Sequence, residues 1–306
     1  MNQIKPDLLL RIEELFLTKC WDINSGNENT LSLFDRFCAR LKLLTAEQQL
    51  FIIELTYSYT IVELACYLEK FYESLIALGD EIYNSKEKIF VYPLLSPFIK
   101  TKLADGVESV KKINKIPTLK TKSSGFLHYM FESDDYTWLS KKFIPNHSIK
   151  FLQAKFNNKD SILLLIDDFV GSGTTAKGIC EEYLKEETSS GRIHPDNLKI
   201  VSIAAQRQGI IELKESLGID VISSMTFDKG ISDKYHEPIR SAKTNLMEQI
   251  ETVLDVEEEF RFGYKKSEAL ITMLCKTPNN TFPVYWLETR NKIAPFPRKK
   301  KYLING

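Results

Sequence analysis

The first 85 residues carry apolar side chains at helical spacing. Between residues 8 and 16 they fall on one face of a helix. Residues 45–48, Thr-Ala-Glu-Gln, have the form of a capping box and predict the start of a second helix. Residues 60–63 have a similar form and predict a third helix that ends near Gly79. Because apolar helix faces usually pack into a core, we interpret residues 1–85 as a helical segment that covers the main domain. The alternative is a module that binds DNA or a partner protein.

From residue 88 onward, short apolar runs alternate with helical spacing. The strongest run is 161–166, which is continuous, as in a parallel strand covered on both faces. The helix predicted after it has apolar residues from 176 to 184 at helical spacing. Other strands are predicted at 89–92, 149–152, 199–205, 221–225 and 283–287, and short helices at 126–131 and 210–217. The alternation predicts an α/β domain with a parallel sheet over residues 86–306.

Composition and charge narrow the classes of function. Lysine plus arginine and aspartate plus glutamate each number 41, so the net charge is zero and binding to nucleic acid is not indicated. The five cysteines are scattered without a CxxC pair, which predicts reduced thiols and a cytoplasmic protein. The chain shows neither an apolar run of membrane-spanning length nor a signal-peptide core at its start. Residues 99–122 are rich in lysine and predict a solvated loop or flap.

Residues 162–184 predict a buried strand, a tight loop with two glycines, and a helix. Ligands of open parallel sheets bind at the carboxyl ends of the strands, so this loop is expected to face a ligand. Gly171 and Gly173 let a ligand approach the main chain closely. The unpaired N–H groups and the dipole of the helix start favour an anion such as a phosphate. Hydroxyl donors are added by Ser172, Thr174 and Thr175.

Two adjacent carboxylates, Asp167 and Asp168, precede this loop. Beside a phosphate they repel the anion, which weakens binding unless the ligand also carries hydroxyl groups or a metal ion nearby. A ribose 5-phosphate has this layout, with the phosphate at one end and vicinal hydroxyls at the other. Carboxylates accept strong hydrogen bonds from such hydroxyls. The two aspartates and the loop together therefore predict a ribose-phosphate site.

Residues 163–175, Leu-Leu-Leu-Ile-Asp-Asp-Phe-Val-Gly-Ser-Gly-Thr-Thr, resemble the phosphoribosyl pyrophosphate motif of type I phosphoribosyltransferases. In that motif four apolar residues precede two acidic residues and a loop that ends in Thr/Ser-Gly-x-Thr. Residues 206–209, Gln-Arg-Gln-Gly, and the segments around them resemble the next strand–helix–strand unit of orotate-type members. The resemblance covers about residues 160–228. It implies the parallel-sheet phosphoribosyltransferase fold, here with an N-terminal helical segment, and transfer of phosphoribose to a base or related acceptor.

The resemblance also implies a role for each matched residue. Asp167 and Asp168 would be the catalytic pair that holds the ribose 2- and 3-hydroxyls. The 5-phosphate would be bound by Gly171, Ser172, Gly173, Thr174 and Thr175. The implied cofactor is Mg²⁺, which would neutralise the pyrophosphate and be held largely through the substrate, beside the two aspartates.

The pyrophosphate loop of the family should follow an early strand. Its candidates here are Ser96-Pro97 and the run Lys122, Ser123, Ser124 and Gly125. The second candidate offers a cation, hydroxyls and a glycine before a predicted helix, although a plain helix cap explains it equally well. Arg207 either contacts the pyrophosphate or pairs with an acid. The lysine-rich residues 100–121 are a candidate for the mobile catalytic loop, or only a solvated surface.

The acceptor pocket has candidates near the end of the chain. Amides can read the edges of a base and an aromatic ring can stack on it, which points to Asn279, Asn280 and Trp286. A polar turn before a strand accounts for the same residues.

Residues 167–175 also resemble the S-adenosylmethionine motif Asp-Pro-Phe-x-Gly-Ser-Gly-Thr-Thr of amino-methylating DNA methyltransferases. Three features favour the phosphoribosyltransferase. Asp168 replaces the proline, and the sequence has no Asp/Asn/Ser-Pro-Pro-aromatic catalytic motif. Residues 204–206, Ala-Ala-Gln, offer no acid for the adenosyl ribose.

The motif does not decide between an enzyme and a regulator. A regulator would bind phosphoribosyl pyrophosphate or a nucleotide and act on a partner protein or a second copy through its N-terminal helices. The order of helical segment, aspartate–glycine motif and the turn at 277–281, Thr-Pro-Asn-Asn-Thr, resembles stand-alone bacterial proteins of conflict or anti-phage gene clusters. That resemblance implies a role as a defence effector.

Overall fold

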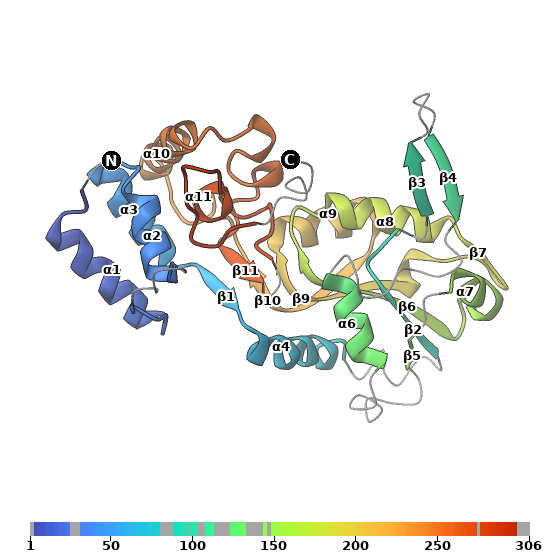
Figure 1. Ribbon diagram of the computed structural model, residues 1–306. Helices are drawn as coiled ribbons and strands as arrows, with labels where there is room; N and C mark the ends of the chain where they lie inside the picture. Colours follow the sequence, from blue (N-terminus) through green and yellow to red (C-terminus); the bar gives the residue numbers. More distant parts are fainter. Residues whose placement is uncertain are drawn as a thin grey trace. The chain divides into compact units, whose positions relative to one another are not determined.

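The computed structural model describes residues 3–24, 31–79, 88–96, 98–102, 108–112, 123–132, 143–145, 148–273 and 276–298. Backbone contacts divide the chain into two compact units (Figure 1). Unit 1 comprises Met1–Leu64 and Asp228–Gly306, and unit 2 comprises Ala65–Phe227. This division differs from the expected domains 1–85 and 86–306, because the C-terminal residues pack with the first helices.

Unit 2 is built on five parallel strands in the order β10-β9-β6-β2-β5 (Figure 1). Their bounds are β2 Lys88–Pro93, β5 Phe143–Pro145, β6 Ser161–Val170, β9 Leu198–Gln206 and β10 Asp220–Phe227. The apolar residues of β6 from 162 to 166 are at most 3% exposed. Since both faces of this strand are covered, its continuous apolar run is explained. The expected α/β class with a parallel sheet is confirmed.

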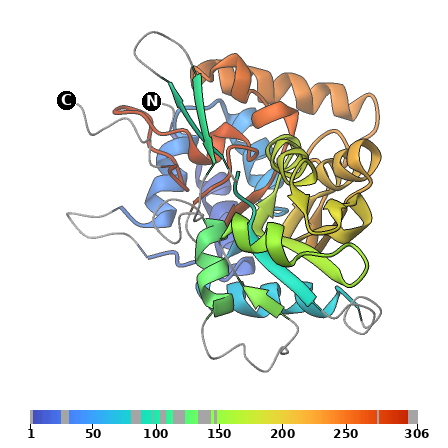
Figure 2. The ribbon, with the colours of Figure 1, turned by 90° about the vertical axis from the view of Figure 1, so that its right-hand side faces the viewer.

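Helices cover both faces of this sheet. Their bounds are α4 Leu64–Ile76, α6 Ser123–Glu132, α7 Ile149–Lys155, α8 Thr174–Leu184 and α9 Arg207–Leu217. Figures 1 and 2 show α8 and α9 on one face and α4 and α6 on the other. Two short hairpins complete unit 2, β3 Phe98–Lys102 with β4 Glu108–Lys112 and β7 Glu187–Thr188 with β8 Gly191–Arg192. None of the described helices has the length and apolar character needed to cross a membrane.

Unit 1 is mainly helical. Its helices are α1 Pro6–Thr18, α2 Leu33–Leu41, α3 Ala46–Thr56, α10 Ile239–Val253 and α11 Pro283–Trp286, with short 3-10 helices at Glu258–Phe260 and Tyr264–Lys266. The capping box predicted at Thr45 is confirmed, since its hydroxyl accepts from the N–H of Gln48. The core includes stacked rings of Tyr59 and Phe296, whose centroids lie 4.9 Å apart.

Several local predictions were wrong. Residues 149–152, predicted as a strand, begin the helix α7. Within the predicted strand 283–287, residues 283–286 form the helix α11, which has a proline at its first position. Short apolar runs fit a buried helix as well as a strand. Residues 60–62 form the strand β1 (Thr60–Val62), which pairs in parallel with β11 (Ile271–Met273), and the helix starts only at Leu64. Within the expected loop 99–122, the described residues form the β3–β4 hairpin and the others lie outside the described part.

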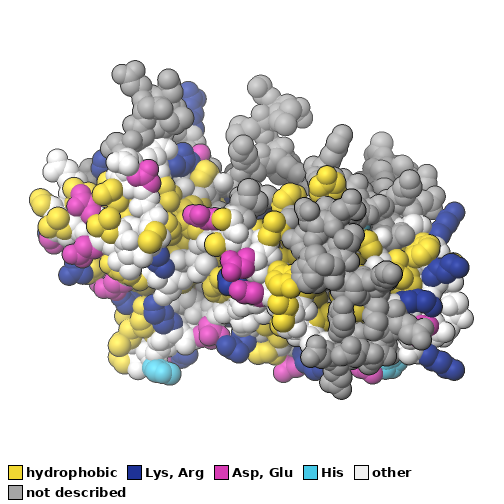
Figure 3. Space-filling model, turned by 90° about the horizontal axis from the view of Figure 1, so that it is seen from below, with side chains coloured by type: hydrophobic (Ala, Val, Ile, Leu, Met, Phe, Trp, Pro, Cys, Tyr) yellow, Lys and Arg dark blue, Asp and Glu magenta, His cyan; other side chains and the backbone are white. Residues whose placement is uncertain are grey.

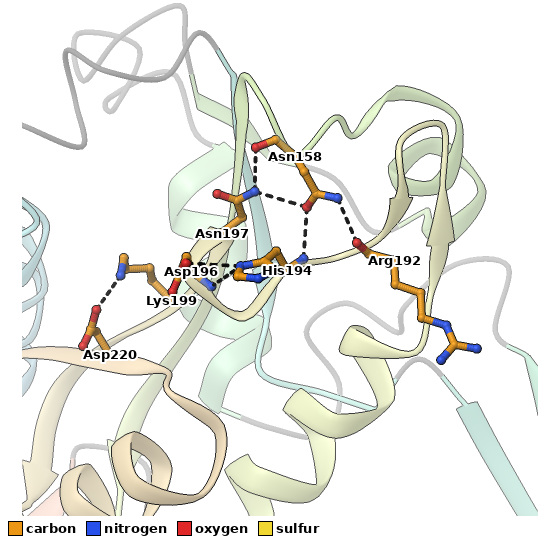
Figure 4. A network of polar contacts seen from close by, with 7 residues as sticks. All are labelled: Asn158, Arg192, His194, Asp196, Asn197, Lys199 and Asp220. Atoms are coloured by element: carbon orange, nitrogen blue, oxygen red, sulfur yellow. Dashed lines mark hydrogen bonds and ion pairs between the residues drawn. The ribbon is translucent and has the colours of Figure 1, made fainter.

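A polar network closes the amino edge of the sheet (Figure 4). The Asn158 side-chain amide donates to the carbonyl of Arg192 (2.8 Å), and its oxygen accepts from the N–H of His194 (3.0 Å). Asn197 donates to the carbonyl of Asn158 (2.7 Å). Figure 3 shows several basic side chains toward its right-hand side. The exposed basic residues close in sequence to this network include Lys155, Lys159 and Arg192. These cations therefore belong to the edge opposite the candidate phosphate site.

Ser74 of α4 bridges one main-chain group of β9 and one of β10. Its hydroxyl lies 2.8 Å from the carbonyl oxygen of Ser202 in β9 and accepts from the N–H of Ser224 in β10, also at 2.8 Å. It also lies 2.9 Å from the carbonyl of Lys70, one turn earlier. Because Ser74 is fully buried, its hydroxyl satisfies two strand groups that water cannot reach.

We expect Ser74→Ala to lower the free energy of unfolding by about 1–3 kcal/mol, because a buried donor and a buried acceptor lose their partner. Urea denaturation would measure this. The matched control is Ser216→Ala in α9, whose exposed hydroxyl donates to the carbonyl of Glu212 within its own helix. Equal stability of wild type and Ser74→Ala would show that the Ser202 carbonyl and the Ser224 N–H find other partners once the hydroxyl is removed.

Unit 1 holds a carboxyl group in its core. Glu251 of α10 is fully buried and accepts from the N–H of Phe262 at 2.8 Å. Burial raises the pKa of this carboxyl to about 8, against the opposing effects of that hydrogen bond and of nearby Arg261, while Glu248 and Glu258 raise it further. The folded protein therefore keeps this proton at pH values where the unfolded chain has lost it.

The stability of the wild type should fall as the pH rises from about 5 to 8, because the folded state binds one more proton than the unfolded state in this window. The slope from Glu251 alone is at most about 1.4 kcal/mol per pH unit. Glu251→Gln should remove this slope, and Glu248→Gln, at an exposed position of the same helix, should keep it. The comparison is made by urea denaturation at both pH values, and an unchanged slope in Glu251→Gln would contradict the expectation.

Candidate functional site

The strand order places a switch of direction between β2 and β6. The chain passes from β2 outward to β5 and then returns to β6 on the other side of β2. In open parallel sheets, ligands bind at the carboxyl ends of the two strands that flank such a switch. Pro93, the last residue of β2, pairs with Ile166, so the two following residues of β6 extend past the end of β2. Those two residues are Asp167 and Asp168.

The two aspartates have different surroundings. Asp168 is 8% exposed, whereas Asp167 is half-buried and lies opposite Ser202 of β9. The N–H of Asp168 donates to the Asp167 carboxylate at 2.9 Å. Carboxylate oxygens at the carboxyl edge of a sheet can accept hydrogen bonds from ligand hydroxyls or hold a hard cation.

The loop after β6 leads directly into the first turn of α8. Gly173 has φ 81°, in the left-handed region, and precedes α8 without a side-chain cap. Ser172 is buried and its hydroxyl donates to that of Thr174 at 3.3 Å, while Thr174 and Thr175 are exposed. A helix start of this kind presents main-chain N–H groups to an anion. The structure thus brings the five predicted phosphate-binding residues together beside the two aspartates.

The first turn of α9 packs against the same loop, a contact that the sequence analysis missed. A Cβ atom added at Gly209 would lie 2.1 Å from the carbonyl oxygen of Gly171. One turn further along both helices, the Lys177 ammonium lies 2.8 Å from the Glu212 carboxylate. The sequence feature that could have indicated this contact is Gly209, a glycine inside a helical pattern.

The structure describes some of the candidate pyrophosphate-binding residues. Lys122 and Pro97 lie outside the described residues. Ser123 begins α6, and Ser124 and Gly125 are buried in its first turn, with the helix packed on β2 and β6. Arg207 is exposed and opens α9 at the carboxyl end of β9. The other candidate, Ser96, donates to the carboxylate of Glu182 in α8.

The acceptor candidates lie in unit 1, where their polar groups bind neighbouring residues. The Asn280 amide donates to the hydroxyl of Ser267 at 2.8 Å, and the Trp286 indole donates to the carbonyl of Thr281 at 2.6 Å. The carbonyl of Asn279 accepts from the N–H of Tyr264 at 2.8 Å. These contacts fix the turn before α11.

Asn280→Ala should lower the free energy of unfolding by about 1–3 kcal/mol, since the buried Ser267 hydroxyl loses its amide partner. Thermal or urea denaturation would test this. Asn279→Ala replaces the same side chain at the preceding, half-buried position and should have a smaller effect. The reverse order of the two variants would contradict the structural role of Asn280.

Among the described residues, no three or more histidine, cysteine, aspartate and glutamate side chains form a group that could hold a metal ion.

A parallel α/β sheet whose central strand ends in two aspartates, followed by a glycine and hydroxyl loop at a helix start, defines a phosphoribosyltransferase-like protein. The model of the PRTase-CE family matches residues 44–298, and the chain therefore belongs to this phosphoribosyltransferase-type family.

Among solved structures, the chain is similar to the AQ2163 protein from Aquifex aeolicus. The two are 12% identical over 74% of this chain and 87% of that chain, with a TM-score of 0.26. No curated protein matches the chain.

Proposed function

We propose that this protein binds phosphoribosyl pyrophosphate at the carboxyl edge of β6 and transfers its phosphoribose to a base or related acceptor. The observation that carries the proposal is the position of Asp167 and Asp168, past the end of β2 and separated by five residues from a helix start without a side-chain cap. Membership of a phosphoribosyltransferase-type family supports it.

Each part of this site has a separate task in the proposal. Asp167 and Asp168 accept hydrogen bonds from the ribose 2- and 3-hydroxyls. The main-chain N–H groups and hydroxyls of residues 171–175 bind the 5-phosphate. Fixing the ribose at both ends leaves its C1 atom as the mobile reacting centre, and the nearby carboxylates stabilise the positive charge that develops there.

The implied cofactor Mg²⁺ suits the donors that are present. Both aspartates offer hard carboxylate oxygens, the ligands that Mg²⁺ prefers, and substrate phosphates complete its coordination in sites of this kind. When bound, the ion would neutralise the charge of the departing pyrophosphate.

A second function is favoured by one observation. The acceptor candidates Asn280 and Trp286 bind neighbours within unit 1, so the residues that would select a base are not assigned. A regulator would bind phosphoribosyl pyrophosphate or a nucleotide at the same aspartates and loop without transferring phosphoribose. Pyrophosphate release in the presence of candidate bases separates the two functions, because only the enzyme produces it.

The proposal is tested by calorimetric titration with phosphoribosyl pyrophosphate and Mg²⁺. The wild type should bind, and Asp167→Asn/Asp168→Asn should bind at least about tenfold more weakly, since hydrogen bonds to charged groups contribute about 1.5–3 kcal/mol each. Asp196→Asn, at the exposed amino edge, is the control and should bind like the wild type. Binding of S-adenosylmethionine instead would establish the methyltransferase alternative and overturn the proposal.

A further inference from the structure

We propose that Gly209 is a positioning residue that sets the conformation of the phosphate-binding loop. The inference rests on the proposed function, because it assigns a role to the first turn of α9 in binding the 5-phosphate at residues 171–175. Gly209 itself is buried behind the loop.

The loop and the helix are in contact through their main chains. A Cβ atom at Gly209 would meet the carbonyl oxygen of Gly171 at 2.1 Å and the nitrogen of Gly173 at 3.0 Å. In the other direction, a Cβ atom at Gly173 would lie 3.0 Å from the carbonyl oxygen of Gly209 and 3.3 Å from Cβ of Glu212. A Cβ atom at either glycine would therefore overlap the main chain of the facing segment, and neither position tolerates a side chain without movement.

Other described contacts of the loop lie at its junction with α8, where the carbonyl of Gly173 accepts from the N–H of Lys177 at 2.8 Å. The residue before α8, Gly173, has no side chain to cap the helix, and the hydroxyl bond from Ser172 to Thr174 is long at 3.3 Å. The Lys177–Glu212 ion pair holds α8 and α9 together one turn beyond the contact. The direction of the loop N–H groups thus depends on the surface on which the loop rests, and Gly209 forms that surface.

A methyl group at this position should displace the loop. The carbonyl of Gly171 would have to move by about 1 Å to restore ordinary contact distances. The displacement turns the N–H groups away from the phosphate position but leaves Asp167 and Asp168 in the sheet. Binding of the phosphate end should therefore weaken more than binding of the ribose hydroxyls.

The variant for the test is Gly209→Ala, and the matched control is Gly178→Ala in α8. A Cβ atom at Gly178 would meet nothing within 4 Å, so the same substitution there is sterically free. Titration with phosphoribosyl pyrophosphate and Mg²⁺ should show at least about tenfold weaker binding for Gly209→Ala, since each lost hydrogen bond to the charged phosphate contributes about 1.5–3 kcal/mol. Gly178→Ala should bind like the wild type. Ribose 5-phosphate should lose affinity in Gly209→Ala, and ribose should not.

Hydrogen exchange without any ligand separates this inference from the proposed function. In Gly209→Ala the amides of residues 171–176 should exchange faster than in wild type, while those of β2 keep their protection. If the wild type binds no phosphoribosyl pyrophosphate, the proposed function fails, and the exchange result still decides whether Gly209 shapes the loop. Wild-type affinity or unchanged exchange in Gly209→Ala would overturn the inference.

If Gly209→Ala does not fold, hydrogen exchange of the wild type with and without ligand tests the inference. Binding of phosphoribosyl pyrophosphate with Mg²⁺ should then slow exchange in the first turn of α9, residues 207–210, as well as in residues 171–176. Slower exchange confined to residues 171–176 would overturn the inference.

Discussion

The burial of β6 between β2 and β9 is the constraint on which unit 2 depends. Each apolar side chain from 162 to 166 contributes about 1.5–3 kcal/mol relative to an exposed position. A strand covered on both faces cannot place charged groups in its middle without a large cost, so carboxylates can appear only where the strand passes its neighbour. Asp167 and Asp168 stand at that point. The need to bury β6 thus determines where its charges, and with them a ligand, can be accommodated.

Much of unit 2 follows from local pattern. The run 161–166 and the helical spacing after it predict β6 and α8 with the loop between them, because period and glycine placement are properties of consecutive residues. The run 149–152 was predicted as a strand and forms a helix, since isoleucine, phenylalanine and leucine suit either structure. Contacts between residues far apart in the sequence leave no comparable pattern along the chain and were not predicted. The hydroxyl of Ser74 between β9 and β10, and the backbone of Gly209 against Gly171, both depend on which elements become neighbours.

In unit 1, too, the sequence did not determine the role of a polar side chain. Asn280 was a candidate for reading a base, with a polar turn as the alternative; its amide bonds Ser267 and its carbonyl accepts from the N–H of Ala269. A Cβ atom at Gly263 would lie 2.0 Å from that carbonyl, so the turn fits closely against the preceding loop. A buried amide that holds two main-chain segments together and an amide that binds a ligand look identical in a sequence. Only the partners of the side chain distinguish them.

The match to the family model includes residues of both units. The resemblance read from the motif covers about residues 160–228, which lie almost wholly in unit 2. The PRTase-CE match runs from 44 to 298, and so includes α3, α10 and α11 of unit 1. It begins just before Thr45, which caps α3, and leaves α1 and α2 outside. The matched residues therefore include the packing of α3 against α10, the buried Glu251 and the Asn280 turn, as well as the two aspartates and the loop of unit 2.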